Sequence, residues 1–248
     1  MKKKLGIGCL SIIGILFLLT VIGYLKYNES LPESESGPEA EALAAKMLAR
    51  VDKPAWDSLN YISWTFVNSH HFAWDKRANH AIISWDKNEV LMDLDEVTGK
   101  AYIDGKEVTG DSAQNLTSTA WSHWCNDSFW LAAPYKIKDP GTKRSIVNTD
   151  DGNKALMITY EGGGVTPGDS YLWLLDDTGL PYAYKMWVSI LPLGGIKAEW
   201  KDWQKLPGGA MIAENHPLSP VPMNVTITNL KAGQKISDLD LDNNAFNL

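Results

Sequence analysis

The chain has 248 residues, of which 44% are hydrophobic and 11 are tryptophan, so it is not disordered as a whole. Lysine and arginine number 23 and aspartate and glutamate number 30, which gives a formal net charge of −7. Lys2, Lys3 and Lys4 precede an uncharged stretch, and taking them from the 23 leaves 20 basic against 30 acidic residues. This acidic balance argues against nucleic acid as a partner, because phosphate backbones need a basic surface.

The stretch from Leu5 to Leu25 is apolar and carries no charge. At about 1.5 Å per residue, a helix over it would cross the roughly 30 Å hydrocarbon core of a bilayer. The lysines before it favour a cytoplasmic N-terminus and export of the rest of the chain. We therefore predict that 1–26 is a cytoplasmic end followed by a single transmembrane helix. The alternative is a signal peptide cleaved near Gly23.

The chain has two cysteines, Cys9 in the apolar stretch and Cys125 in the exported part. Cys125 therefore has no partner within the exported part, and the fold is not a disulfide scaffold. A small, buried, apolar role is the simplest expectation for its side chain.

The stretch 27–38 is polar and acidic and contains two prolines, which predicts a linker. After it, apolar residues recur at helical spacing, which predicts an amphipathic helix with one face on the core. Ser36 and Glu39 have capping-box spacing at its start. The apolar positions of this helix are Ala40, Leu43, Ala44, Met47, Leu48 and Val51.

From Tyr61 onward the apolar period changes to two, as in half-buried strands. Short alternating runs follow one another about ten residues apart, which is typical of an antiparallel meander. Asp104-Gly105 lies between two such runs and predicts a type I′ hairpin, whose turn requires positive φ angles.

A helical stretch interrupts the strands. Asp111 is a candidate N-cap for a helix that carries Trp124 on its apolar face. Asp127 is a candidate cap for a second short helix, which Pro134 would end. With the first amphipathic helix, this region could fill the hollow of a curved sheet.

Strands are predicted again over 145–230. We expect Ile196–Trp203 to be one strand, which would place Trp200 and Trp203 on opposite faces. The tail 234–248 is acidic and is expected to fray. The predicted fold class is α+β, mainly antiparallel β, with the folded domain over 39–233.

The densest group of aromatic residues lies in the helical stretch. These side chains either form the wall of a pocket for an apolar ligand or are ordinary core between helix and sheet. The cavity candidates are Leu116, Trp121, Trp124, Phe129, Trp130 and Trp173.

Residues for chemistry are sparse. His70 and His71 are adjacent on a predicted strand and would face opposite sides, which argues against joint metal ligation. His123 and Asp127 lie close to Ser122 in sequence, and a hydrolase built on them is the least favoured alternative. We predict no catalytic residue, no metal and no cofactor, and expect that the protein is not an enzyme.

Several segments together resemble the LolA/LolB-like superfamily of bacterial periplasmic carriers and receptors for outer-membrane lipoproteins. The resemblance implies an unclosed antiparallel barrel whose hollow is covered by helices and binds acyl chains, here in an uncharacterised bacterial branch. It also implies that the exported domain lies in the periplasm, held to the inner membrane by the retained helix. The segments are DKRANHAIISWD (Asp75–Asp86), FWLAAPYKIKDPGTK (Phe129–Lys143), YLWLLDDTGLPY (Tyr171–Tyr182), EWKDWQKLPGGAMIAENHPL (Glu199–Leu218) and MNVTITNLKAG (Met223–Gly233).

These observations predict a membrane-anchored periplasmic protein that binds a lipid, a lipoprotein acyl chain or another hydrophobic ligand without covalent chemistry. Its expected partners are such a ligand or an acylated protein, and the membrane through its N-terminal helix. The alternative is an envelope assembly or scaffold protein whose hollow is filled by its own side chains and which acts through protein contacts. If the signal is cleaved, the protein would instead be free in the periplasm.

Overall fold

The structure is a computed structural model that describes residues 22–162 and 167–248. The predicted transmembrane helix over 5–25 lies almost entirely outside the described residues, which begin with a helical segment at 22–27. Among the residues that the structure describes, no helix is both long and apolar enough to cross a membrane.

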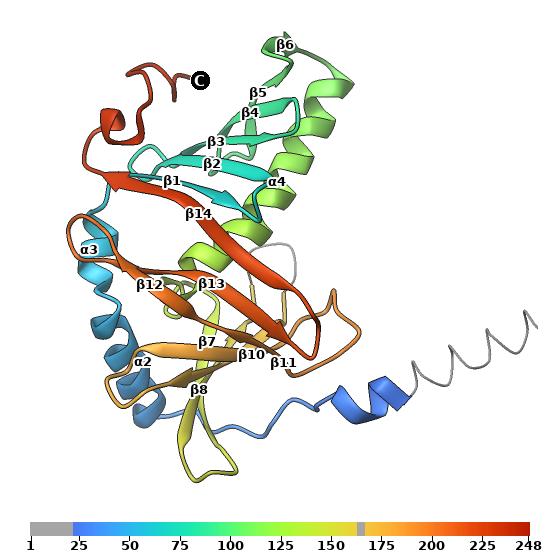
Figure 1. The fold of residues 1–248 in the computed structure, drawn as a ribbon, viewed down its shortest axis with the longest axis vertical. Coiled ribbons are helices and arrows are strands. Elements are labelled where there is room, and N and C mark those ends of the chain that lie inside the picture. Colours follow the sequence, from blue (N-terminus) through green and yellow to red (C-terminus); the bar gives the residue numbers. More distant parts are fainter. Residues whose placement is uncertain (1–21, 163–166) are drawn as a thin grey trace, which may run out of the picture.

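Antiparallel strands form one long, unclosed sheet (Figure 1). Within the described part of the chain it has 14 strands, in the order β6-β5-β4-β3-β2-β1-β14-β13-β11-β10-β9-β8-β7, with β12 paired to β13 off this path. This confirms the predicted unclosed, mainly antiparallel architecture with a few helices. The strands are β1 (Tyr61–Phe66), β2 (His70–Asp75), β3 (His80–Trp85), β4 (Asn88–Asp93), β5 (Thr98–Ile103), β6 (Lys106–Val108), β7 (Thr142–Asn148), β8 (Lys154–Tyr160), β9 (Ser170–Leu175), β10 (Pro181–Trp187), β11 (Ile196–Glu199), β12 (Lys201–Lys205), β13 (Met211–Ser219) and β14 (Asn224–Gly233).

Helix α2 (Pro38–Arg50) confirms the first amphipathic helix, with its apolar stripe buried. The predicted capping box is wrong, because Gly37 is the N-cap and no side chain caps the helix. The carboxylate of Glu39 is engaged by Lys154 of β8 instead. A short helix that the sequence analysis missed, α3 (Lys53–Ser58), follows at once, and its N-cap Asp52 accepts a hydrogen bond from the Ala55 N–H at 3.1 Å.

The two short helices predicted after Asp111 are one continuous helix, α4 (Asp111–Ala132), followed by the 3₁₀ turn η1 (Ala133–Tyr135) that contains Pro134. Asp127 is therefore not a cap. Its carboxylate is buried inside the structure, where it meets a histidine of β2. α4 packs against β3, β4, β5 and β13, and it continues through the residues where the end of one helix and the start of another were predicted.

The hairpin between β5 and β6 has the predicted turn. Asp104 has φ 49° and Gly105 has φ 73°, so both central residues take the left-handed conformation that a type I′ turn requires. Strand pairing on either side, from Ile103 with Lys106 to Ala101 with Val108, fixes the register.

Trp200 and Trp203 do not lie on opposite faces. The expected single strand is two strands, β11 and β12, and Asp202 within β12 has φ 54°. This break in the alternation lets the two indole rings stack, with centroids 5.9 Å apart and planes 30° apart. Trp200 is buried and Trp203 is half-buried.

The C-terminal tail packs on the fold instead of fraying. It contains the turn η2 (Ile236–Leu239), and its Leu239 and Phe246 are buried. They form a cluster with Tyr61, Ala73 and Leu91 on the face of β1, β2 and β4 that points away from Trp64 and Phe72. Leu239 and Phe246, which lie among the acidic residues of the tail, thus cover this face of β1, β2 and β4.

The predicted linker lies along the sheet (Figure 1). The backbone N–H of Glu29 donates to the Gly194 carbonyl at 3.0 Å, and the Trp187 indole N–H donates to the Glu29 carbonyl at 2.8 Å. Glu35 forms an isolated antiparallel β-bridge with Ile146 of β7, in which each backbone N–H donates to the carbonyl of the other residue. The segment therefore connects the described N-terminal helical residues to β7 and β10 by specific bonds.

Candidate functional site

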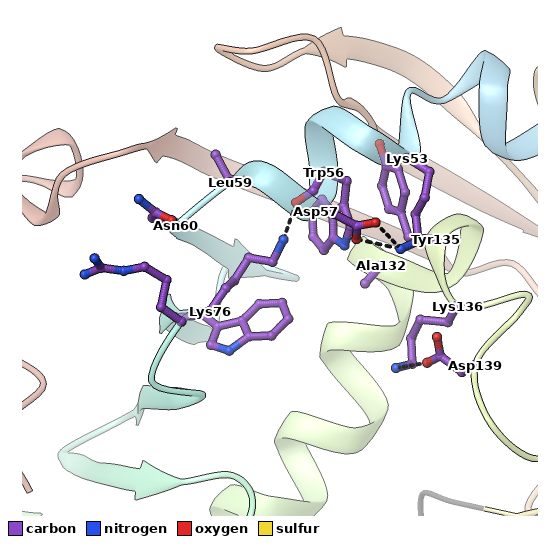
Figure 2. Close-up of a pocket in the computed structure, with 12 residues that line it drawn as sticks. Lys53, Trp56, Asp57, Leu59, Asn60, Lys76, Ala132, Tyr135, Lys136 and Asp139 are labelled. Atoms are coloured by element: carbon purple, nitrogen blue, oxygen red, sulfur yellow. Dashed lines mark hydrogen bonds and ion pairs between the residues drawn. The ribbon is translucent and has the colours of Figure 1, made fainter.

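A pocket lies where α3, the turn between β2 and β3, and the C-terminal end of α4 meet (Figure 2). Its volume is about 370 Å³, within the usual range for small-molecule sites. We call it the α3–α4 pocket. Helix α3 supplies Trp56, β2 supplies Trp74, and η1 supplies Tyr135.

The walls of the α3–α4 pocket are aromatic. The Trp56 and Tyr135 rings stack with centroids 4.4 Å apart and planes within 5° of parallel. The Trp74 ring is tilted against Trp56 at a centroid distance of 6.2 Å. Leu59 and Ala132 add aliphatic surface. All of these side chains except the half-buried Trp74 are buried, so the limited apolar surface that they present to the pocket is already held in place.

Lys76 brings a cation to these rings. Its side chain reaches from the end of β2 toward α3, where the ammonium donates to the backbone carbonyl of Trp56 (Figure 2). Nζ lies 4.2 Å from the centroid of the Trp56 ring and 5.6 Å from that of Trp74, which are cation–π distances. Burial lowers the pKa of Lys76 to about 8, with Lys53 acting in the same direction and Asp57 opposing.

The rim of the pocket is richer in cations than in anions. Lys53 pairs with Asp57 across one turn of α3 at 2.5 Å, and Lys136 pairs with Asp139 at 2.6 Å. Arg77 also lines the pocket, but its guanidinium lies 3.8 Å from the Asp75 carboxylate and donates to the Tyr61 hydroxyl, whereas Lys76 adds a cation that is not ion-paired within the described residues. The lining is therefore net positive, although the whole chain carries −7. An aromatic wall beside the ammonium of Lys76 suits an amphiphile with an anionic group.

This pocket was not predicted from the sequence, although one signal for it was present. Asp52 followed by Lys53-Pro54 is an N-cap with proline in the first turn, a recognised helix start that would have placed Trp56 on a short helix. The contact of α3 with the turn after Asp75 is a tertiary relationship between segments 20 residues apart.

The six predicted cavity residues lie elsewhere, between α4 and the sheet. Trp173 is fully buried against Tyr184 and Trp200, and Trp130 is buried against Tyr184. Trp124 is buried, with its ring 5.9 Å from that of Trp64. The other three are half-buried and pack on the same core, and none of the six lines the α3–α4 pocket: Leu116, Trp121 and Phe129.

His123 and Asp127 do meet a partner, but it is not Ser122. The Ser122 hydroxyl donates to the Ser118 carbonyl at 3.1 Å on the exposed side of α4. The partner is His70, whose Nδ1 lies 2.6 Å from Oδ2 of Asp127. Burial raises the pKa of Asp127, against hydrogen bonds from His70 and Asn126, and burial also lowers the pKa of His123.

A sequence signal for this cluster existed. On β2, His70 falls on the same face as Phe72 by strand alternation, and on α4, Asp127 follows His123 by one turn, so both share a face near Trp124. Phe72 and Trp124 are in ring contact at 6.2 Å. As expected, His71 faces the other way, and its Nδ1 is 2.9 Å from the Thr65 hydroxyl.

No protein-family model and no curated protein matches this chain. Among solved structures, the chain is similar to the crystal structure of a DUF1329 family protein from Desulfovibrio piger. The TM-score is 0.42 and the sequence identity 13%, over 84% of this chain and 98% of that one. The similarity is a distant one of fold. The resemblance to LolA and LolB stays a prediction.

Proposed function

We propose that this protein is held to the inner membrane by its N-terminal segment, faces the periplasm and binds an amphiphilic ligand non-covalently in the α3–α4 pocket. The ligand is a lipid with an anionic group. The observation that carries the proposal is the position of the Lys76 ammonium over the indole rings of Trp56 and Trp74. One wall thus offers apolar surface and a positive charge together.

The energetics favour such a ligand. Each methylene that leaves water for the aromatic wall gains about 0.8 kcal/mol. A carboxylate or phosphate at Lys76 would form a charge-assisted hydrogen bond, which is about twice as strong as a neutral one. Lys53 and Lys136 stand at the rim and would add attraction over a longer range. A half-barrel of the kind that the LolA-like resemblance implies would supply the frame.

A scaffold function is the second candidate, and one observation favours it. The space between α4 and the sheet is filled by aromatic side chains of the protein, among them Trp64, Trp124 and Trp173, which are all buried. A filled interior leaves no deep hollow for an acyl chain in this region and suits a protein that acts through its surface. A binding experiment separates the two candidates.

The experiment titrates a dansyl-labelled fatty acid with a free carboxylate into residues 27–248, after circular dichroism has shown that this fragment is folded. We expect saturable binding that Lys76→Met weakens about tenfold or more, since a hydrogen bond to a charged group contributes about 1.5 to 3 kcal/mol. Lys87→Met, in the exposed turn at the other end of β3, is the matched control and should bind like the wild type.

Two outcomes would reject the proposal. Absence of saturable binding by the folded fragment would favour the scaffold function. Equal affinities for wild type and Lys76→Met would show that the fatty acid binds outside the α3–α4 pocket.

A further inference from the structure

Three potential metal ligands converge between β2 and α4, at a place that does not share a residue with the α3–α4 pocket. His70 is the first residue of β2, and His123 and Asp127 lie one turn apart on α4. One ligand atom from each residue lies within 4.8 Å of the other two.

We propose that His70, His123 and Asp127 form a binding site for a divalent transition metal ion, with Zn²⁺ as the expected ion. Two imidazole nitrogens and one carboxylate oxygen are a donor set that zinc accepts readily. Three protein ligands leave one position of a tetrahedral zinc for water or an exogenous ligand. The inference stands independently of ligand binding in the α3–α4 pocket.

The burial of Asp127 makes a cation at this place favourable. The residue is 2% exposed, and a buried carboxylate is costly unless it is paired or bound to a metal. A proton shared between Asp127 and His70 would link only these two side chains. It would not involve His123, although the centroids of the His123 and His70 rings are 3.9 Å apart. A divalent cation would engage all three side chains at once.

Small side-chain movements would complete the coordination. Nδ1 of His70 and Oδ2 of Asp127 are now 2.6 Å apart, whereas two ligand atoms on a tetrahedral zinc are about 3.3 Å apart for bonds of about 2.0 Å. The metal would replace the hydrogen-bonding proton between them. The His70 side chain keeps 24% of its surface exposed, which gives an ion access from solvent.

Surrounding residues orient the ligands, as partners around metal sites commonly do. The Asn126 amide donates to Oδ1 of Asp127 at 2.7 Å, which leaves Oδ2 directed at His70. The Trp85 ring packs edge-on against His123 at a centroid distance of 5.2 Å and an angle of 72°. Phe66 stacks on His70 at 6.3 Å.

The test measures Zn²⁺ binding by calorimetry to the full chain in detergent, prepared without a histidine tag. Co²⁺ absorption in the visible range reports the coordination geometry. We expect one Zn²⁺ per chain with micromolar or tighter affinity, and Co²⁺ bands typical of four-coordination. His123→Ala and Asp127→Asn should each weaken Zn²⁺ binding about 100-fold. His71→Ala is the matched control, an exposed histidine on the same strand that faces the other way, and should leave binding unchanged.

Circular dichroism establishes that each variant is folded. If Asp127→Asn does not fold, His123→Ala decides alone, because the His123 side chain is only half-buried. The proposal is overturned if the wild type binds no Zn²⁺ even at a Zn²⁺ concentration 100-fold above the expected micromolar dissociation constant. It is equally overturned if folded His123→Ala binds Zn²⁺ as tightly as the wild type.

Discussion

The hydroxyl of Tyr135 is hydrogen-bonded to both the backbone N–H and the backbone carbonyl of Met211. It accepts a hydrogen bond from the Met211 N–H at 2.8 Å and lies 2.6 Å from the Met211 carbonyl oxygen. The same hydroxyl is 2.9 Å from the carbonyl oxygen of Val51, the C-cap of α2, which also accepts a hydrogen bond from the Met211 N–H at 3.1 Å. Since the Tyr135 ring also stacks on Trp56, one side chain connects the wall of the α3–α4 pocket to α2 and β13.

Tyr135→Phe should lower the free energy of unfolding by about 0.5 to 1.5 kcal/mol, the net contribution of a typical hydrogen bond. The ring and its stacking on Trp56 remain, and the Met211 N–H still donates to the Val51 carbonyl at 3.1 Å, but the hydrogen bonds of the hydroxyl to these backbone groups are lost. Urea unfolding measures the change. Tyr182→Phe removes a hydroxyl from a side chain that is 49% exposed and should change the free energy of unfolding by less than about 0.5 kcal/mol. Equal effects in the two variants would contradict this explanation.

Binding of an anionic amphiphile should weaken as the pH rises through about 8. Lys76 in the free protein has a pKa of about 8, lowered by burial, and its neighbours in the pocket include Lys53, Asp57 and Lys136. Lys76 attracts the anion only when it is protonated, so bound ligand raises the pKa of Lys76, and the affinity falls once this lysine is neutral in the free protein. Titrations of the dansyl-labelled fatty acid at pH 6.5 and pH 9.5 should show this loss.

Lys76→Arg is the matched variant for this pH dependence. Arginine stays charged throughout the range, so its affinity for the fatty acid should be nearly the same at both pH values. A wild-type affinity that does not change between pH 6.5 and pH 9.5 would exclude Lys76 as the group that contacts the anion.

His216 should make the fold less stable in mild acid. Burial lowers its pKa to about 4, against a smaller opposite effect of backbone carbonyls of Glu199 and Ala213, whereas an unfolded histidine has a pKa of about 6.5. Below pH 6.5 the unfolded chain therefore binds the proton and the folded one does not. The stability that follows from keeping His216 neutral is fully present above pH 6.5 and is lost progressively as the pH falls toward 4. Between pH 7 and pH 5 the loss should be about 2 kcal/mol.

His216→Phe tests this contribution. Phenylalanine is similar in size and should keep the contacts with the Trp130 and Trp200 rings, but it cannot take up a proton. Urea unfolding at pH 7 and pH 5 should show a stability loss that is smaller in the variant by about 2 kcal/mol. An identical loss in both proteins would assign the acid sensitivity to other groups.

Local patterns predicted the elements of this fold well where the relevant interactions lie close in sequence. Asp104-Gly105 forms its hairpin because the two residues themselves adopt positive φ angles. The strands β1 to β4 follow their alternating residues, and α2 follows its apolar stripe. In each case the residues of the element itself were enough to predict it.

The candidate sites depend on contacts between distant segments, and these the sequence analysis could not place. Asp127 looked like a helix cap because acidic residues often begin helices, but its carboxylate is bonded to His70, 57 positions away. The local sequence around Lys76 does not indicate a site, and only the position of α3 places the Lys76 ammonium over Trp56. The prediction for Trp203 failed because one positive φ angle, at Asp202, ends the alternation.

The linker should stabilise the domain as well as connect it to the N-terminal segment. Residues 27–248 should fold and stay soluble, because this fragment keeps the ion pair of Glu29 with Lys185 and the bridge between Glu35 and Ile146. A fragment that begins at Gly37 keeps all of α2 but loses these bonds. Its free energy of unfolding should be about 2 to 4 kcal/mol lower, at about 0.5 to 1.5 kcal/mol for each of several hydrogen bonds.

The shorter fragment should also aggregate more readily. β7 is the last strand of the sheet order, and the bridge from Glu35 to Ile146 occupies part of its open edge. Without residues 27–36 those backbone groups are free to pair with another chain. Urea unfolding and light scattering of the two fragments measure both effects. Equal stability and equal scattering would mean that 27–36 is only a connection, and that the bonds to β7 and β10 contribute nothing in solution.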